Sequence, residues 1–489
     1  MTKKMAFFEK SSIINRAWRQ SAIYAAGTFL LSVGQVALSP LLTRKLSVAE
    51  YGSYEILVVT YIALRTLLII PFSSALVYGH CKRCNNEEDR KALLSVFFLI
   101  SAMLSLFFVM SGMLIPHWPA LLIGRGSIAS SIGFLILGAL ALDVFVQIAL
   151  GAFRASQQPV YYGIVALTQL IGTLGLSWLL VGCYAMGIKG VFEAMLISNL
   201  IADILVIPIF SHRLSCTLNS RKARPVIIYA ITLMPINIAN LILSISDRYF
   251  LKNFFGLKTV GLYALSYRIG SGISIFIVLP FLTAWPALIF SEKDSTRIGE
   301  YVGKAASNLW MVGMFFVSVG AAAAKPLLLL FGGKKFLSGA MIVPIVSIGT
   351  LFYGITQVFL SLAVTRGKIY LNMKVLIIAA IVALILNALM IPKYGMIGAA
   401  LATSLSYAFG AALSYIYVRR LEPVKIESQK TLAFFFCGLL GAVAGRFVDG
   451  VSANSPLNFL MVVLLSATVY IISVKIIGIM PAMPFNIKR

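Results

Sequence analysis

Apolar segments of about 20 residues, the length of helix that crosses a hydrocarbon core of about 30 Å, follow one another along almost the whole chain. Short stretches that carry charge, glycine or proline separate them. Sixty per cent of the 489 residues are hydrophobic and only 12% are charged, against roughly 25% charged residues in soluble domains. Because water is not the main solvent for such a chain, the sequence predicts a membrane protein.

The apolar segments have the pattern of helices and not of barrel strands. In a transmembrane barrel, polar and apolar residues alternate over segments of about ten residues, whereas the runs 135–142 and 376–386 are apolar on all sides. We therefore predict an all-α membrane protein with about fourteen transmembrane helices. The predicted spans are 20–42, 54–78, 92–115, 128–152, 160–182, 190–211, 226–246, 262–290, 303–324, 341–364, 371–391, 397–418, 431–449 and 456–478.

Lysine and arginine are distributed unevenly between alternate loops. With the N-terminus inside, 27 of them fall on the cytoplasmic side and 12 on the opposite side. Since cytoplasmic loops carry the excess of basic residues, we predict that both termini are cytoplasmic. The basic N-terminal segment lacks a small-residue cleavage site and is expected to be a retained anchor. The net charge of +25 then indicates contact with anionic lipid, not with nucleic acid.

The sequence offers no cofactor site. Five cysteines, an odd number, are scattered over distant segments, which predicts no disulfide framework. His80, Cys81 and Cys84 would make half of a zinc site, but no second ligand pair accompanies them, so we expect no metal. No Gly-x-x-x-x-Gly-Lys-Ser/Thr run is present to bind ATP. The direction of transport would therefore come from coupling to H⁺ or Na⁺, or from polymerisation that consumes the transported unit on the periplasmic side.

Two pairs of small-residue motifs indicate an internal repeat. Gly52 and Gly261 open corresponding spans at an offset of 209, and the motif Gly187, Gly190, Ala194, Ser198 matches Gly395, Gly398, Ala402, Ser406 at an offset of 208. Six spans per repeat is an even number, so the halves insert the same way up, as in parallel-repeat transporters with a site between the halves. We predict a six-helix lobe at 1–215, a second at 216–420, and two added helices with a short tail at 421–489.

Three stretches resemble the polysaccharide and O-antigen (Wzx-type) flippases, which share a superfamily with the multidrug and toxin extrusion transporters. They are 41–47 followed by 50–54, 235–251 followed by 261–263, and 392–400. The resemblance covers nearly the whole chain. It implies translocation of an undecaprenyl-diphosphate-linked oligosaccharide from the cytoplasmic to the periplasmic leaflet of the bacterial inner membrane. The resemblance also implies pathway partners, namely the polymerase and chain-length proteins of a surface polysaccharide such as O-antigen, capsule or exopolysaccharide.

Two arginines fall inside predicted spans, where a charge is costly and is a functional candidate by default. Arg65 lies near the middle of the second span and Arg268 about two turns inside the eighth. A guanidinium engages phosphate oxygens through paired donors and never deprotonates, so both are candidates to bind the lipid diphosphate. The alternative is that each arginine forms a structural pair with a carboxylate of another helix.

Three acids are candidates for ion coupling or for such a pair. Asp143 in the fourth span and Asp203 in the sixth are surrounded by apolar residues, and each is a possible partner of Arg65. Glu193, near the entrance of the sixth span, is a weaker candidate, because its repeat partner is Leu401.

Asp247 and Arg248 are adjacent at the predicted end of the seventh span and match the flippase-like pattern. We expect them to be structural, because charged residues anchor a helix at little cost where it leaves the membrane.

Other functions remain open from the sequence. A cation-coupled multidrug antiporter would share the fold, but Arg65 would repel organic cations. A membrane-embedded polymerase or glycosyltransferase would need a large extramembrane loop with catalytic residues, and the predicted loops are short. A channel would show rings of polar residues. We therefore predict a transporter and not an enzyme.

Overall fold

The computed structural model describes residues 34, 36–84, 86–124, 126–211, 220–291, 298–449 and 456–476. Within these ranges the chain is almost entirely helical and has no strand, which confirms the all-α prediction. The basic N-terminal segment and most of the first predicted span, 20–42, lie outside the described residues, as does the C-terminal tail. The predicted location of both termini in the cytoplasm stays a prediction.

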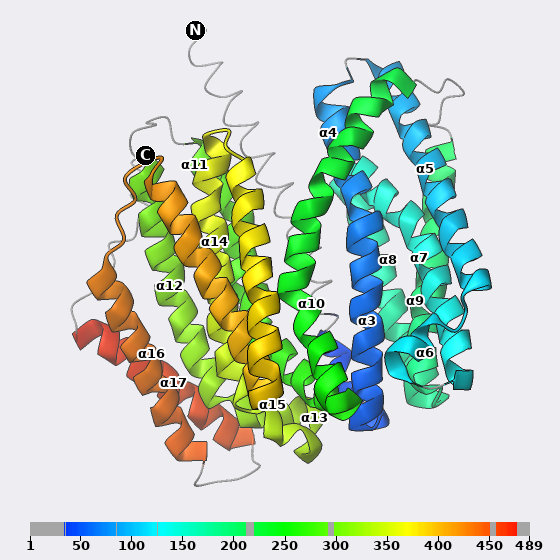
Figure 1. Cartoon of the computed structure of the whole chain (residues 1–489). Coiled ribbons are helices and arrows are strands. Elements are labelled where there is room, and N and C mark those ends of the chain that lie inside the picture. Colours follow the sequence, from blue (N-terminus) through cyan, green and yellow to red (C-terminus); the bar gives the residue numbers. More distant parts are fainter. Residues whose placement is uncertain are drawn as a thin grey trace, which may run out of the picture. The chain divides into compact units, whose positions relative to one another are not determined.

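The chain divides into two compact units, Met1–Ile238 and Ala239–Arg489, and the division falls within one long helix, α10 (Ser220–Gly270). The other helices of the first unit are labelled in Figure 1 and are α2 (Ser39–Lys45), α3 (Val48–Leu68), α4 (Ile70–Lys82), α5 (Glu87–Leu114), α6 (Trp118–Ile123), α7 (Gly126–Ala155), α8 (Pro159–Ser177), the π-helical turn η1 (Trp178–Cys183) and α9 (Gly187–Ser211).

The second unit continues from the later part of α10. Its remaining elements are the π-helical turn η2 (Ser274–Val278), α11 (Leu279–Ser291), α12 (Ile298–Ala322), α13 (Ala324–Gly332), the 3₁₀ turn η4 (Lys334–Gly339), α14 (Ile342–Thr365), α15 (Tyr370–Arg419), α16 (Ser428–Asp449) and α17 (Pro456–Ile476).

Each unit is organised around its most buried helices. In the first unit α7 packs against α4, α5 and α9, and α8 packs against α9. In the second unit α12 packs against α14 and α16, while α14 packs along α15. Helix α3 shows how a boundary is fixed locally. The Ser47 Oγ accepts a bond from the Glu50 N–H at 3.2 Å, and the Ser47 N–H donates to Glu50 Oε2 at 2.9 Å, which satisfies two N–H groups at the start of the helix.

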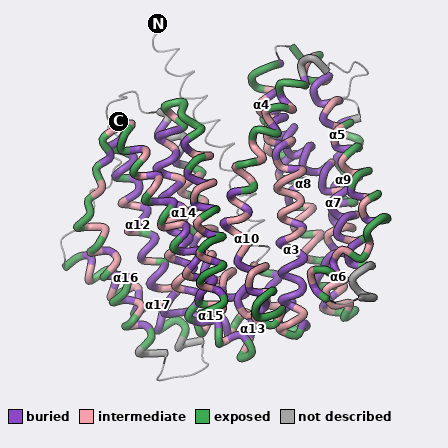
Figure 2. Tube along the Cα trace, in the orientation of Figure 1, coloured by how far each residue is buried: buried purple, intermediate pink, exposed green. Residues whose placement is uncertain are grey.

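Many residues along the helices are exposed, as the green segments in Figure 2 show, and large apolar residues are numerous among them. Examples are Met103 and Leu106 on α5 and Ile204 on α9. Eleven helical segments of the described residues are long and apolar enough to cross a membrane. An apolar surface of this extent is unfavourable in water, so the chain is a multi-pass membrane protein.

Two of the eleven segments are interrupted by a glycine with non-helical backbone angles. Gly256 breaks α10 (φ 77°, ψ 178°), and Gly395 breaks α15 (φ 55°, ψ −129°). The predicted seventh and eighth spans lie on either side of the first break, and the eleventh and twelfth on either side of the second. The first predicted span lies mainly outside the described residues, so the count of fourteen stays a prediction.

The residues of the predicted repeat occupy equivalent positions in their own units. Gly187 opens α9 with φ 60° and Gly395 opens the second part of α15 with φ 55°, a backbone region that glycine enters without steric cost. Downstream, Ala194 and Ser198 are fully buried, as are their partners Ala402 and Ser406. The predicted lobe boundaries at 215/216 and 420/421 stay predictions.

Helices within each unit approach closely where glycine faces serine. A methyl group on Gly151 would lie 2.6 Å from the Ser73 Oγ, and one on Gly172 would lie 2.7 Å from the Ser198 Oγ. In the second unit, a methyl group on Gly349 would lie 2.5 Å from the Ser404 Oγ. Small residues of this kind let membrane helices pack backbone to backbone.

Candidate functional site

A polar cluster lies inside the first unit, where four apolar helices meet. Its members come from α3, α7, α8 and α9 and are Arg65, Asp143, Gln147, Gln169, Asn199 and Asp203. Polar groups in a membrane bundle are costly unless they bond to one another. This concentration in one place therefore marks a candidate site.

Arg65 and Asp143 form an ion pair across α3 and α7. The Arg65 Nε donates to Asp143 Oδ2 at 2.6 Å, and the two side chains are 31% and 2% exposed, respectively. Of the two acids predicted as possible partners of Arg65, the structure pairs it with Asp143. Within the described part of the chain, Nη1 and Nη2 of Arg65 make no hydrogen bond. The guanidinium is therefore oriented by one carboxylate and keeps further donors available.

The second oxygen of Asp143 is held by amides. Gln147 on α7 and Gln169 on α8 donate their Nε2–H groups to Asp143 Oδ1 at 3.1 and 3.3 Å. Gln169 Nε2 also donates to Asn199 Oδ1 at 2.8 Å, and Asn199 Nδ2 donates to the Ala139 carbonyl at 2.9 Å. This network links α7, α8 and α9 and fixes the carboxylate that orients Arg65.

Asp203 is the unsatisfied member of the cluster. It lies one turn after Asn199 on α9 and is 3% exposed. Neither carboxyl oxygen has a hydrogen-bond partner among the described residues. An isolated ionised carboxylate is costly to bury, so a proton or a cation at this position would remove a substantial penalty.

The structure separates the other predicted site residues from this cluster. Glu193 forms an ion pair with Lys189 one turn earlier on α9, with Nζ and Oε1 3.3 Å apart. Arg268 is half-buried in the last turn of α10 and belongs to the second unit. The prediction that Arg65 and Arg268 contact one substrate stays a prediction.

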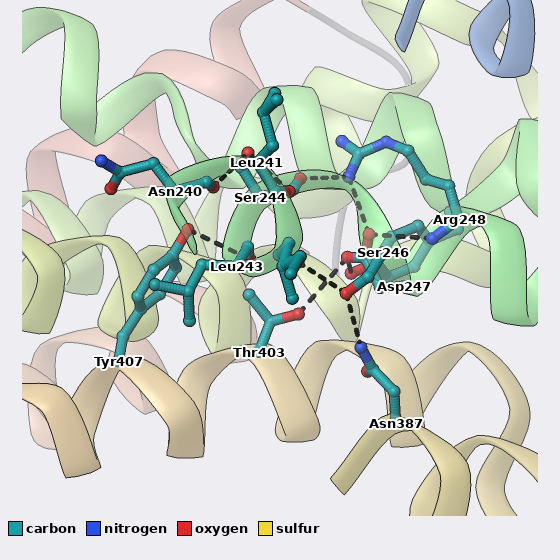
Figure 3. A network of polar contacts seen from close by, with 12 residues as sticks. Asn240, Leu241, Leu243, Ser244, Ser246, Asp247, Arg248, Asn387, Thr403 and Tyr407 are labelled. Atoms are coloured by element: carbon teal, nitrogen blue, oxygen red, sulfur yellow. Dashed lines mark hydrogen bonds and ion pairs between the residues drawn. The ribbon is translucent and has the colours of Figure 1, made fainter. Parts of the chain in front are cut away.

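A second polar cluster surrounds Asp247 in the second unit (Figure 3). Asp247 Oδ1 accepts bonds from the backbone N–H of Arg248 at 2.8 Å and from its Nη1 at 3.0 Å. Asp247 Oδ2 accepts the hydroxyl protons of Tyr263 at 2.5 Å and of Thr403 at 3.3 Å. Beside them, Asn387 Nδ2 donates to the Ser246 Oγ at 3.0 Å.

Arg248 is almost as deeply buried as its partner Asp247. Its side chain is 6% exposed and that of Asp247 is 1% exposed. Arg248 Nη1 donates to the Ser244 carbonyl at 2.9 Å, and the guanidinium carbon lies 4.3 Å from the centre of the Tyr267 ring. Helix α10 continues past residue 246 as far as the break at Gly256, and the structural role expected of this pair at the end of a span stays a prediction.

Sequence reasoning overlooked the amides of the first cluster. Gln147 follows Asp143 by four residues and Asn199 precedes Asp203 by four, so each amide lies on the same helix face as an acid. That spacing is a usable signal. Gln169 has no acid on its own helix, so only the packing of α8 reveals its role.

Solved structures with this fold are membrane transporters and a lipid flippase. A structure of the lipid II flippase MurJ in an inward closed conformation matches with a TM-score of 0.74 at 16% identity, over 93% of this chain and 98% of that one. The Vibrio cholerae MATE transporter VcmN matches with a TM-score of 0.61 at 17% identity, over 85% and 98% of the two chains. At these identities the likeness establishes the fold alone.

The sequence comparison identifies the family. A family model described as polysaccharide biosynthesis protein matches residues 17–292, more than half of the chain, and the chain belongs to this family. The capsular polysaccharide biosynthesis protein CapF of Staphylococcus aureus is 32% identical over 177 residues, which are 35% of this chain and 43% of CapF. The chain thus aligns with less than half of that relative's length. The resemblance to polysaccharide flippases is confirmed.

Proposed function

We propose that this chain is a flippase that carries undecaprenyl-diphosphate-linked oligosaccharide repeat units from the cytoplasmic to the periplasmic leaflet of the bacterial inner membrane, by alternating access. The family supports a role in polysaccharide biosynthesis. The fold is one that a lipid II flippase also adopts. A polymerase and chain-length proteins would act on the delivered unit.

The observation that carries this proposal is the geometry of Arg65. Its Nε is fixed on Asp143 at 2.6 Å, its side chain is 31% exposed, and its terminal nitrogens make no hydrogen bond within the described residues. A guanidinium held in this way is ready to engage phosphate oxygens through two parallel N–H donors. Such a group within membrane-spanning helices suits a diphosphate head group that must leave water.

Asp203 supports a second part of the proposal, that transport is coupled to H⁺ or Na⁺. Its buried oxygens lack partners in the described part of the chain, so ligand binding or conformational change that alters their surroundings would change the affinity for a cation. Asp203 and Asp143 lie in the same cluster as Arg65, which would link ion binding to the phosphate site.

A multidrug antiporter of the same fold is the alternative, as the likeness to MATE transporters indicates. Such a transporter must receive organic cations. The partly exposed Arg65 disfavours them, because like charges repel strongly at low dielectric. A polymerase or glycosyltransferase is disfavoured because the described segments between long helices are short.

The test is complementation of a strain that lacks the gene, with undecaprenyl-linked repeat units measured on the two sides of the membrane. We expect the deletion strain to accumulate the repeat unit on the cytoplasmic side and to lose surface polysaccharide. The native chain should restore export. Arg65→Ala should restore less than about 1% of it, on the scale that a lost charged contact commonly produces.

Arg420→Ala is the matched control, because Arg420 is exposed at the end of α15. It should export normally. Normal export by Arg65→Ala at native protein levels would remove Arg65 from the site. A deletion strain without cytoplasmic-side accumulation would refute the flippase function itself.

A further inference from the structure

A cavity of about 240 Å³ lies inside the second unit, between α10, η2, α14 and α15. Eight residues line it, and every one is polar and uncharged: three tyrosines, three serines, one threonine and one asparagine. Packing alone would favour apolar residues in a membrane bundle, since buried polar groups need partners. A lining of this kind therefore suits an occupant with which it can hydrogen-bond.

Three hydroxyl groups of the lining already donate their protons to backbone carbonyls. Ser244 Oγ donates to the Asn240 carbonyl at 2.8 Å, Thr350 Oγ1 donates to the Val346 carbonyl at 2.9 Å, and Ser271 Oγ donates to the Arg268 carbonyl at 3.2 Å. A hydroxyl that has donated its proton still offers lone pairs. These three hydroxyls thus present acceptors, which suit a ligand that brings O–H or N–H donors.

The tyrosines add flat apolar faces to these acceptors. Tyr267, Tyr353 and Tyr407 come from three different helices, and the Tyr407 hydroxyl donates to the Leu243 carbonyl at 3.4 Å. Figure 3 shows the Tyr407 phenol and the Asn240 amide at the opposite end of the view from Arg248. Aromatic rings with polar tips suit a ligand that has both apolar faces and a polar rim.

We infer that this cavity is a subsite for one pyranose ring of the oligosaccharide, an inference that rests on the proposed flippase function. A pyranose is neutral, has C–H groups on its two faces and donates O–H groups around its rim. The volume corresponds to roughly eight water molecules at about 30 Å³ each, which fits one sugar ring and not a chain. Tyr353 and Thr350 of α14 would contact the ring together with Tyr407 of α15, whose aromatic ring lies beside that of Tyr353 with the ring centres 5.4 Å apart.

The first experiment uses the full chain in lipid nanodiscs and two probes: undecaprenyl diphosphate that carries one N-acetylglucosamine, and undecaprenyl diphosphate without a sugar. We expect the native chain to bind the sugar-bearing lipid about tenfold more tightly. Combined Tyr353→Phe and Thr350→Val substitutions should reduce this advantage below about twofold, with the affinity for the bare lipid unchanged.

Thr356→Val is the matched control, because Thr356 is also buried on α14 and donates to the Phe352 carbonyl at 2.9 Å, but does not line the cavity. It should keep the full advantage of the sugar. Equal affinity of the native chain for both probes would overturn the subsite. An equal loss of affinity for both probes in the double variant would overturn it too.

Binding of neither probe would overturn the proposed function, and a second measurement tests the cavity without it. Ser271→Cys is labelled with a maleimide in the presence of glucose, galactose, N-acetylglucosamine or, as a control, glycerol. Peptide mass spectrometry reads position 271 separately from the native cysteines. At least one sugar should slow labelling about threefold or more, as expected at a concentration of twice its Kd. No protection by any of the three would mean that water alone fills the cavity.

Discussion

Each unit buries an arginine beside an aspartate, but the two pairs are constructed differently. Asp247 uses both oxygens to accept four hydrogen bonds, and Arg248 is bonded to a carbonyl and covered by Tyr267. Arg65 uses one nitrogen on Asp143 and remains 31% exposed, while Asp203 in the same cluster has no hydrogen-bond partner among the described residues. We call the Asp247–Arg248 pair saturated, because its hydrogen-bonding groups have partners within the protein, and such a pair stabilises the fold. We call the Arg65–Asp143 pair unsaturated, because Arg65 keeps donors with which it can bind a ligand.

The largest effect is expected from breaking the saturated pair. Asp247→Asn leaves the Arg248 guanidinium buried without its counter-charge, which typically costs about 3 to 5 kcal/mol. Thermal unfolding in detergent and the yield of folded protein measure this loss. Thr403→Val removes only the 3.3 Å bond and should cost about 1 kcal/mol. A stable Asp247→Asn protein that fails to transport would show that the second pair is functional after all.

The unsaturated pair should separate stability from transport. Asp143→Asn is expected to lower transport more than about tenfold, because the fork of Arg65 loses its orientation. Its cost in stability should be about 1 to 2 kcal/mol, since Arg65 is partly exposed and solvent screens it. Combined Arg65→Met and Asp143→Leu should recover the stability without the transport. Recovery of transport in this double variant would show that the pair has only a structural role.

Asp203 should be dispensable for stability. Asp203→Asn removes a buried charge that lacks hydrogen bonds in the described part of the chain, so the free energy of unfolding should be unchanged or should rise by about 1 kcal/mol. Its transport should no longer respond to pH or sodium gradients across proteoliposomes. Transport by the native chain that ignores both gradients would count against ion coupling.

The smallest effect belongs to Glu193. Its ion pair with Lys189 is a single-turn contact on one helix, a type worth about 0.3 to 0.5 kcal/mol. Glu193→Gln should therefore leave thermal unfolding and transport within measurement error. A loss of transport at unchanged stability would instead move Glu193 into the site.

The helices were predictable from the sequence because a membrane forces every backbone group into internal hydrogen bonds, so apolar length alone indicates a helix. Gly395 was also placed correctly between two predicted spans. Gly256 also falls between two predicted spans, but the segment 247–261 predicted to connect them is helical on both sides of that glycine. The charged residues of this segment indicate a loop, whereas the backbone leaves the helical conformation only at Gly256 within α10.

The site was partly predictable for a related reason. Arg65, Asp143 and Asp203 are conspicuous as charges within apolar runs, and the sequence limited the partner of Arg65 to two acids. It did not choose between them, because the choice depends on how α3 faces α7 and α9. The uncharged lining of the cavity around Tyr353 is dispersed over four elements and carries no charge to attract notice.

The contacts between glycine and serine have a consequence for genetic screens. A single added methyl at Gly151 or Gly349 has no room beside the facing serine, so it would wedge two helices apart. Inactive alleles recovered at such glycines would report failed helix packing and not lost substrate contacts, so a map of the substrate path drawn from inactive alleles alone would be misleading.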